Sequence, residues 1–383
     1  MKLVKNANVL APEAIGTHDL LVGGGKILLV ERSIRLSGVN VEVIDAAGLT
    51  LTPGLIDQHV HVTGAGGQQG FDSMTPPVEL GSLVACGTTT VVGLLGTDSS
   101  TRDLQSLYAK TRALDREGIT AYMLTGSFAY PPVTITGSVR GDLLFIDKVL
   151  GCKIAISDER SSFPTAGELA RLVADIHVAG MLSGKGGILH VHVGALDSRL
   201  GVLLELVERY QLPIRRLSPT HVGRTAALFD EAIRFALHGG MIDISTGGTR
   251  FDEPYKQALL ALQRGVPLSR ITFSSDGNAG VVRKDADGRV IDYRRAPLDR
   301  NLEQVIKLIT DGGLAPADAF RLVTSNPAAN LSLPRKGRIV AGADADFCLF
   351  DEHFTLRDVF AGGEALARDG VVLKKGNFEI HNP

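Results

Sequence analysis

The chain of 383 residues carries 40 Lys and Arg against 42 Asp and Glu, which gives a formal net charge of −2. A balance this close to neutral offers no electrostatic reason to bind nucleic acid or an anionic membrane, so we expect neither partner. Hydrophobic residues make up 44% of the chain, enough for a large core, and this excludes global disorder. The sequence contains no uninterrupted apolar run of about 18 residues, so we expect no membrane span.

The cysteines and the first residues indicate the compartment. Cys86, Cys152 and Cys348 are widely spaced and form no CxxC pair. An odd number without that spacing fits neither a disulfide framework nor a cysteine zinc site. Residues 1–19 show no long apolar run followed by a cleavage site, so we expect no signal peptide. Together these features predict a cytoplasmic protein.

Both ends of the chain are typical of short strands separated by turns. In the first fifty residues, Gly23-Gly24-Gly25 predicts a tight hairpin turn between two such strands. The expected strands are residues 3–4, 20–22, 26–30, 41–44, 347–350, 356–361 and 370–374. We therefore predict one small β-sandwich domain built from both termini, residues 1–52 and 335–383.

The middle of the chain, residues 53–334, alternates between strand-like and helix-like segments. Helical spacing of apolar residues is clearest in 101–118, 166–182 and 225–239. Strands are expected at 55–62, 89–94, 120–125, 152–157, 188–193, 214–220, 241–245 and 271–275. Eight strands alternating with helices over roughly 270 residues fit an α/β fold, the (β/α)8 TIM barrel. A doubly wound open sheet is the alternative, although no GxGxxG follows the first strand.

Several of the predicted barrel strands end in residues that can bind metal ions. His59 and His61 close the first strand, and positions i and i+2 of a strand point to the same side. His192 ends the fifth strand, His221 follows the sixth and Asp276 follows the eighth. Active sites of TIM barrels lie at the carboxyl ends of the strands. These five residues therefore predict a metal site at that end.

A lysine and a further histidine stand beside this set. Lys153 lies within the apolar fourth strand, where a lysine is rare unless it is paired. An ammonium group has no lone pair, but a lysine carbamylated by CO2 offers two carboxylate oxygens that can bridge two cations. His190 points the same way as His192. We assign the remaining histidines to the core or the surface: His18, His177, His190, His238, His353 and His381.

This constellation resembles the amidohydrolase superfamily with a binuclear metal centre, and within it the isoaspartyl dipeptidases. Residues 53–61, PGLIDQHVH, look like the superfamily's Pro-Gly-x-Ile-Asp-x-His-x-His motif, and 337–346, GRIVAGADAD, look like its return to the small β domain. Further similar stretches are 92–98, 123–126, 134–139, 153–161, 219–224 and 274–278. The resemblance therefore covers nearly the whole chain.

The resemblance implies a role for each matching residue. One zinc ion would be bound by His59, His61 and Asp276, and a second by His192 and His221. Carbamylated Lys153 and a hydroxide would bridge the two ions. Asp276 would also be catalytic, accepting the proton of the nucleophile and delivering it to the leaving amine. The residues implied to contact substrate are Gly66, Gln68, Thr97, Phe128, Arg160, Arg224 and Gly280.

The two arginines of that set, Arg160 and Arg224, resemble the family's carboxylate-binding arginines. The family resemblance also implies a homo-oligomer, with an octamer as one candidate assembly.

Three positions depart from the isoaspartyl dipeptidase pattern. Gln68 replaces a glutamate that receives the substrate's α-ammonium, Phe128 replaces a tyrosine that polarises the scissile carbonyl, and Gly280 replaces a serine. Tyr130, two residues after Phe128, is a candidate substitute for that tyrosine. The predicted metal ligands are intact while the predicted substrate site is altered.

Three functions therefore remain open. The first is a dizinc hydrolase that cleaves a small amide of the isoaspartyl dipeptide type. The second applies the same chemistry to an N-acyl amino acid or a cyclic amide, as in dihydroorotases and hydantoinases, and Gln68 favours it because such substrates lack a free ammonium. The third is a catalytically inactive interaction protein, which the presence of all six ligand-type residues disfavours.

Overall fold

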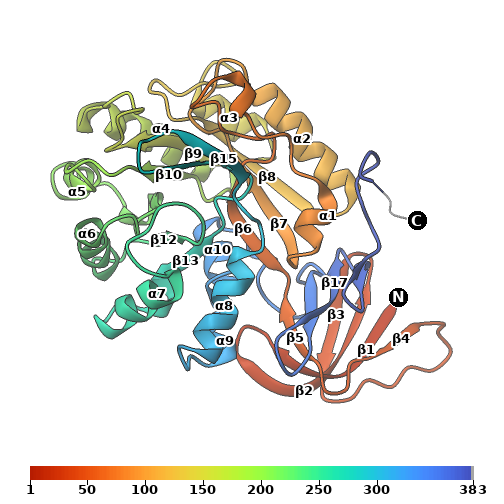
Figure 1. Cartoon of the computed structure of the whole chain (residues 1–383). Helices are drawn as coiled ribbons and strands as arrows, with labels where there is room; N and C mark the ends of the chain where they lie inside the picture. The colour runs from red at the N-terminus through yellow and green to blue at the C-terminus, as the bar shows by residue number, and fades with distance from the viewer. Residues whose placement is uncertain (381–383) are drawn as a thin grey trace.

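The computed structural model describes residues 1–380, apart from the side chain of Lys284. His381 and the last residues of the expected small domain lie outside this range. The chain forms a barrel of strands and helices beside a smaller sheet that contains both termini (Figure 1). Within the described residues, no helix is long and apolar enough to cross a membrane. Cys86, Cys152 and Cys348 are buried and free, as their spacing predicts.

The barrel is a ring of eight parallel strands. In chain order they are β6 (Leu55–Val60), β7 (Thr88–Gly93), β8 (Thr120–Gly126), β9 (Val149–Ile156), β10 (Ile188–Val193), β11 (Leu217–Thr220), β12 (Ile242–Ser245) and β13 (Ile271–Ser274). The last strand returns to the first, because His61 N donates to Gly277 O at 3.0 Å and Val60 forms a bridge with Gly277. The predicted TIM barrel is confirmed.

Helices follow most of the strands and cover the ring. They are α1 (Leu80–Val84), α2 (Leu104–Glu117), α3 (Val139–Phe145), α4 (Ala166–Ser183), α5 (Gly201–Glu208), α6 (Ala226–Leu237), α7 (Pro254–Gln263), α8 (Arg300–Thr310), α9 (Pro316–Arg321) and α10 (Ser325–Asn330). Local sequence sets their ends. Thr165 and Glu168 form a capping box at the start of α4, and Gly184 ends it in the left-handed conformation.

The sixth predicted strand begins later than expected. Residues Ile214–Arg216 form a short 3-10 turn, η2, in which Arg216 N donates to Pro213 O at 2.9 Å, and the strand starts only at Leu217. Two similar turns are η1 (Phe71–Ser73) and η3 (Leu268–Arg270). The expected strand at 214–220 was therefore wrong in its first three residues, because the turn uses their backbone groups before the ladder begins.

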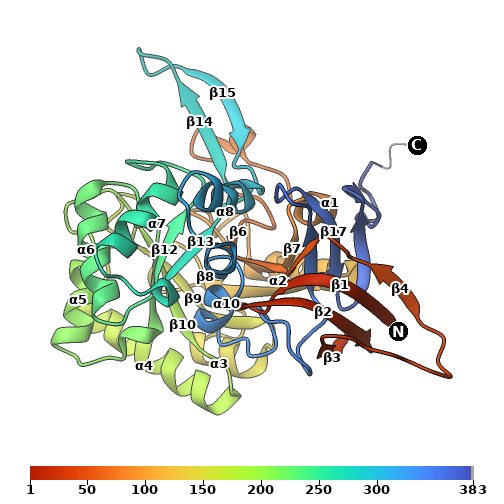
Figure 2. The same ribbon diagram turned by 90° about the horizontal axis from the view of Figure 1, so that it is seen from below.

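A hairpin that the sequence reading missed follows the last barrel strand. Its strands β14 (Gly280–Lys284) and β15 (Val290–Arg295) are antiparallel and project away from the barrel (Figure 2). Most of the side chains of β15 are exposed or half-exposed, so this strand lacks a clean apolar face that could have predicted it.

The smaller sheet has nine strands drawn from both ends of the chain. The N-terminal end gives β1 (Lys2–Leu10), β2 (Ala14–Gly23), β3 (Lys26–Glu31), β4 (Glu42–Asp45) and β5 (Thr50–Pro53), and the C-terminal end gives β16 (Phe347–Phe350), β17 (Leu356–Ala361), β18 (Glu364–Arg368) and β19 (Val371–Val372). The two groups meet where β5 pairs with β16. The predicted turn between β2 and β3 is present, with φ of 60° at Gly24 and 76° at Gly25, which glycine adopts without strain.

This sheet encloses a core of its own, as expected for a small β-sandwich. Side chains from both ends of the chain contribute to it, among them Leu20, Leu51 and the stacked rings of Phe347 and Phe360, whose centroids are 4.4 Å apart. Strands β5 and β18 were not predicted from the sequence. The domain limits 1–52 with 335–383 and 53–334 stay a prediction.

A buried lysine connects the barrel to this sheet. Lys336 Nζ lies 2.5 Å from Asp346 Oδ2 and 3.1 Å from Asp344 Oδ2, and it donates to Thr120 Oγ1 at 2.7 Å. Thr120 opens barrel strand β8, whereas Asp346 directly precedes β16 of the small sheet. Removing the lysine would leave a buried carboxylate without its partner, which is costly.

We therefore expect Lys336→Met to lower the free energy of unfolding by about 3–5 kcal/mol. Denaturant unfolding of the purified variant measures this loss. The control is Lys256→Met, because Lys256 is exposed and makes a long ion pair with Asp252 at 3.8 Å and a contact 5.9 Å from the centre of the Tyr255 ring, and we expect it to cost less than about 1 kcal/mol. Equal effects of the two substitutions would show that Lys336 does not stabilise the junction.

Candidate metal centre and substrate pocket

The barrel strands bring the predicted site residues to one pocket of about 550 Å³. The six candidate metal ligands all line it: His59, His61, Lys153, His192, His221 and Asp276. The seven candidate substrate residues line it as well: Gly66, Gln68, Thr97, Phe128, Arg160, Arg224 and Gly280. The pocket, at the carboxyl ends of the strands, thus brings together residues that lie more than two hundred positions apart in the sequence.

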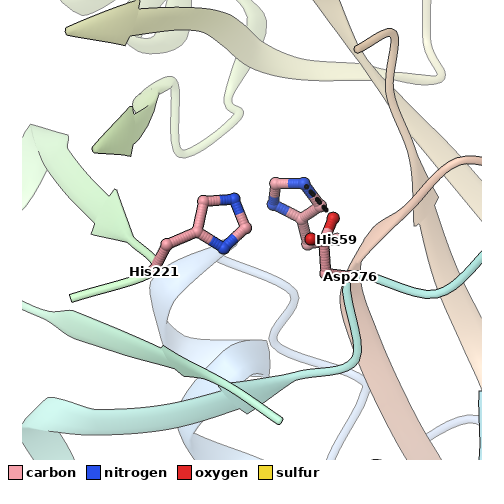
Figure 3. Close-up of side chains that lie close together, drawn as sticks. All are labelled: His59, His221 and Asp276. Atoms are coloured by element: carbon pink, nitrogen blue, oxygen red, sulfur yellow. Dashed lines mark ion pairs between the residues drawn. The ribbon is translucent and has the colours of Figure 1, made fainter. Parts of the chain in front are cut away.

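The carboxylate of Asp276 lies close to three imidazoles, those of His59, His61 and His221. Asp276 Oδ1 lies 3.4 Å from His59 Nε2 and 3.3 Å from His61 Nε2. One ligand atom each of His59, His221 and Asp276 lies within 4.8 Å of the others, and Figure 3 shows the two imidazoles and the carboxylate gathered together. This spacing brings ligand-type atoms within reach of metal ions bound between these side chains.

The backbone is strained where two of these residues leave their strands. His221, after β11, has φ of 62°, and Asp276, after β13, has φ of 52°. A left-handed conformation is uncommon for residues other than glycine, and such strain concentrates at functional sites. Here it lets the chain turn away from the strand while the side chain faces the pocket.

His192 is held by a carboxylate that the sequence reading did not single out. Its Nε2 lies 2.9 Å from Asp158 Oδ2, and Asp158 also accepts from Arg160 Nε at 2.8 Å and Nη2 at 2.7 Å. Partial burial would raise the pKa of Asp158, but the hydrogen bonds from Arg160 and His192 outweigh it and hold this pKa well below its usual range. Arg160 therefore reaches the pocket already paired.

Lys153 is almost completely buried and has no carboxylate partner within 4.0 Å among the described residues. Its Nζ lies 3.2 Å from His59 Nε2 and 5.4 Å from the centre of the Phe128 ring. Burial lowers the pKa of Lys153 to about 7, because it disfavours the charged ammonium. A buried amine that is partly neutral at pH 7 has the lone pair needed to react with CO2.

A second layer of side chains orients the imidazoles from behind. His59 Nδ1 lies 2.9 Å from His190 Nε2, and His190 Nδ1 lies 3.3 Å from Ser218 Oγ. His221 Nδ1 is bonded to Ser245 Oγ. With Nδ1 engaged, Nε2 of each ring is the atom left for a cation, as in histidine metal sites generally. His61 Nδ1 is buried without a partner in the described structure.

These observations fit a metal centre. Burial lowers the pKa of all four imidazoles, so each is neutral and keeps a lone pair at pH 7. Neutral imidazole and carboxylate are the ligands typical of zinc. His190 belongs to the core, as assigned, yet its contact with His59 was missed. The spacing of His190 and His192 on β10, which turns both side chains to the same face, was the sequence signal that could have indicated this contact.

The two candidate arginines differ in which of their N–H groups remain free to bind a substrate. Arg224 donates through Nε to Val193 O at 2.9 Å and forms no ion pair within the described chain, whereas Arg160 is engaged by Asp158. Two further arginines, Arg250 and Arg300, also line the pocket and were missed. Each is paired with a glutamate, Glu253 at 3.2 Å and Glu303 at 2.6 Å.

The three departures from the family pattern have different surroundings. The Phe128 ring packs on His192, with 4.2 Å between ring centroids. Tyr130 does not replace the missing tyrosine, because its hydroxyl points to Glu168 O at 3.4 Å in α4 and it does not line the pocket. A Cβ on Gly280 would lie 2.9 Å from Gly66 Cα, so a serine there would require the backbone to move.

Gln68 is exposed at the pocket rim and shares an adjoining hollow with Thr97 and Glu159. Glu159 is also exposed, and its carboxylate forms no ion pair within the described residues. Asp158, the other acid that lines this hollow, is engaged by Arg160 and His192, so Glu159 is the acid there that is free to pair with a cationic group of a substrate beside Gln68.

The comparisons with known proteins agree with this geometry. The amidohydrolase family matches residues 217–377. A crystal structure of a β-aspartyl dipeptidase from the thermophilic, keratin-degrading Fervidobacterium islandicum AW-1, in complex with a β-Asp-Leu dipeptide, is 41% identical, with a TM-score of 0.92 over 99% of this chain and 100% of that chain.

More distant relatives carry other activities. An adenine deaminase from Methanoregula boonei is 25% identical over 91% of this chain, which spans only 55% of that relative's length. A dihydroorotase from Pelotomaculum thermopropionicum is 24% identical over 91% of this chain and 88% of its own.

We expect the purified protein to hold about two zinc ions per chain, since six ligand-type side chains converge and a carbamate on Lys153 would need two cations to neutralise it. Elemental analysis measures the content. His221→Ala should lower it and should lower the thermal stability gained on adding zinc, whereas His238→Ala, at the exposed end of α6, should change neither. A protein free of metal after purification from zinc-containing medium would contradict this expectation.

Proposed function

The chain belongs to the amidohydrolase family, and from that premise we propose that it is a dizinc hydrolase that cleaves β-aspartyl dipeptides. The observation that carries the proposal is the likeness to a β-aspartyl dipeptidase over almost the full length of both chains. The pocket supports it, because the ligand-type residues and the arginines that this activity needs line one surface.

In this proposal His59, His61 and Asp276 would hold one zinc ion, and His192 and His221 would hold the other. Lys153, carbamylated, would supply a carboxylate ligand to both, and its partly neutral amine supports that modification. When bound, zinc supplies an activated water at neutral pH and polarises the scissile carbonyl.

Asp276 is the proposed general base and acid. Burial would raise the pKa of Asp276, but the hydrogen bond from His61 and the nearby charges, among them those of Lys153 and Arg224, together outweigh it, so the carboxylate is ionised and able to accept a proton. Asp276 Oδ1 takes the proton of the attacking water. The same carboxylate then donates this proton to the nitrogen of the leaving amine, which completes hydrolysis.

The arginines bind the substrate's carboxylates. A β-aspartyl dipeptide carries two carboxylates, one on the aspartyl residue and one at its C-terminus, and guanidinium groups pair with carboxylates through paired hydrogen bonds. Arg224, free of an ion pair, binds one carboxylate fully. Arg160, held in place by Asp158, offers its remaining N–H groups to the other. Gly66, Gln68, Thr97, Phe128 and Gly280 form the remaining walls.

A second candidate function keeps the chemistry and changes the substrate. Gln68 cannot neutralise an ammonium, so an N-acyl amino acid or a cyclic amide fits that position without cost. The dihydroorotase relative supports the same reading. We further propose, from the three free cysteines, that the protein is cytoplasmic, and, from the family resemblance, that it is a homo-oligomer.

Lys153→Ala should abolish hydrolysis of β-aspartyl-leucine, because it removes the bridging carboxylate. Added short carboxylic acids with zinc should restore part of the activity by occupying the vacated space. Lys256→Ala, on the exposed face of α7, is the matched control and should keep the wild-type rate. Near-normal turnover by Lys153→Ala would make this lysine structural and remove the bridge from the proposal.

Gln68→Glu should raise kcat/KM for β-aspartyl dipeptides by up to about tenfold, equivalent to about 1.4 kcal/mol, by pairing the substrate's ammonium. The gain should vanish for N-acylated dipeptides, which have no ammonium. Adding Phe128→Tyr should raise kcat rather than lower KM, because its hydroxyl would act on charge present only in the transition state.

Glu159→Gln separates two ways of binding the ammonium. If Glu159 already binds it, this substitution raises KM for β-aspartyl-leucine but not for its N-acetyl derivative, and Gln68→Glu adds nothing. Efficient cleavage of β-aspartyl-leucine by the wild type, with no effect of either substitution, would show that neither position receives the ammonium. Gly280→Ser is unsuitable as a test because of its close approach to Gly66.

A further inference from the structure

A second cavity lies at the opposite end of the barrel from the proposed active site. Its volume is about 600 Å³. Its walls include Ile188, the first residue of β10, and Met241 and Arg270, which directly precede β12 and β13. Because the barrel strands are parallel, their first residues gather at the end away from hairpin β14–β15 (Figure 2).

The charged residues of this cavity all have the same sign. Lys185, Arg215, Arg216 and Arg270 line it, and no aspartate or glutamate is among the lining residues. The proposed active site also contains arginines, but there Asp158, Glu253 and Glu303 pair with three of them. In the far cavity none of the four cations forms an ion pair within the described residues, and the acid whose charge acts on Lys185, Asp147, lies outside the lining.

The hydrogen bonds of these four cations leave their charges largely uncompensated. Lys185 Nζ donates to three backbone carbonyls, those of Leu143, Ile146 and Val149, at 2.6–3.1 Å. Arg216 Nη1 donates to Gly187 O at 3.1 Å, and its Nε is buried without an acceptor. Neither the Arg215 nor the Arg270 side chain forms an ion pair or a hydrogen bond within the described residues.

Like charges gathered without a counter-charge repel one another. Partial burial, and then the charge of Arg215, lower the pKa of Arg216, which reflects this crowding. A bound anion would remove the repulsion and accept the unused N–H groups. Guanidinium forks match the oxygens of a phosphoryl group, and several arginines converging on one concavity favour a ligand with more than one negative charge.

We propose that this cavity is a binding site for a phosphoryl-bearing small molecule, held chiefly by Arg215, Arg216 and Arg270. The volume, about 600 Å³, is within the range of small-molecule sites, so it admits a ligand larger than phosphate itself. The site is separate from the chemistry of the metal pocket and does not depend on the proposed function.

The test uses inorganic phosphate as the probe and the zinc-loaded, full-length protein. Isothermal titration calorimetry measures saturable binding, and thermal unfolding measures the rise in Tm that binding causes. The test variant is Arg215→Gln with Arg270→Gln, because these side chains make no interaction whose loss would unfold the protein. The matched control is Arg209→Gln with Arg264→Gln, which removes the same charge from exposed pairs with Glu205 and Asp230.

We expect the wild type and the control to bind phosphate alike, and the test variant to bind at least about tenfold more weakly, since each lost charged hydrogen bond contributes about that factor. Without phosphate, the Tm of the test variant should equal or exceed that of the wild type, because repulsion is removed. A merely structural role for these arginines would instead lower it.

Three outcomes would overturn the proposal. One is the absence of saturable phosphate binding to the wild type. Another is unchanged binding by the test variant together with competition against substrate, which would assign phosphate to the metal pocket. The third is a changed oligomeric state of the test variant without phosphate binding, which would assign the cavity to contacts between copies of the chain.

Discussion

The site depends on one constraint: four imidazoles and one amine are buried together beside two carboxylates, Asp158 and Asp276. Burial lowers the pKa of His59, His192 and His221, so these imidazoles are neutral, and it lowers the pKa of Lys153 to about 7, so this amine is partly neutral at pH 7. Each neutral group then exposes a lone pair toward the pocket. A cluster of lone pairs beside carboxylates is a poor hydrophobic core and a good receptor for cations, which is the role the proposed function gives it.

The barrel interior is built to tolerate this arrangement. Below the imidazoles, Gln58 donates to Asp243 Oδ1 at 2.7 Å and to Thr272 Oγ1 at 2.8 Å, and Asn330 donates to Gln58 Oε1 at 2.9 Å. Asn330 also donates to Ser218 Oγ, which in turn contacts His190 behind His59. A buried polar network whose members are satisfied fixes its side chains in place, whereas a partly satisfied one destabilises the fold. The imidazole positions are therefore set by residues that never face the pocket.

The sequence predicted what depends on local pattern and missed what depends on pairing across the fold. Seven of the eight barrel strands lie close to their expected positions, because buried parallel strands are continuous apolar runs ending in turns. Strand β5 was missed because its partners β1 and β16 come from opposite ends of the chain. Likewise the positions of His59, His61 and Asp276 at strand ends indicated a metal site. The residues around Asp158 in the sequence, in contrast, contain no pattern that predicts its hydrogen bonds with His192 and Arg160.

Two of the departures from the family pattern, Gly280 and Gln68, lie on segments whose backbones approach each other closely. Strand β14 begins at Gly280, and there the chain passes so close to Gly66 that a Cβ would meet its Cα at 2.9 Å. The hairpin β14–β15 and the loop carrying Gln68 thus share a contact that only glycine allows. A serine at 280 and this approach of the two segments exclude each other. The hairpin therefore shapes the substrate site by its position, and a serine at 280 would require the hairpin or the Gly66 segment to shift.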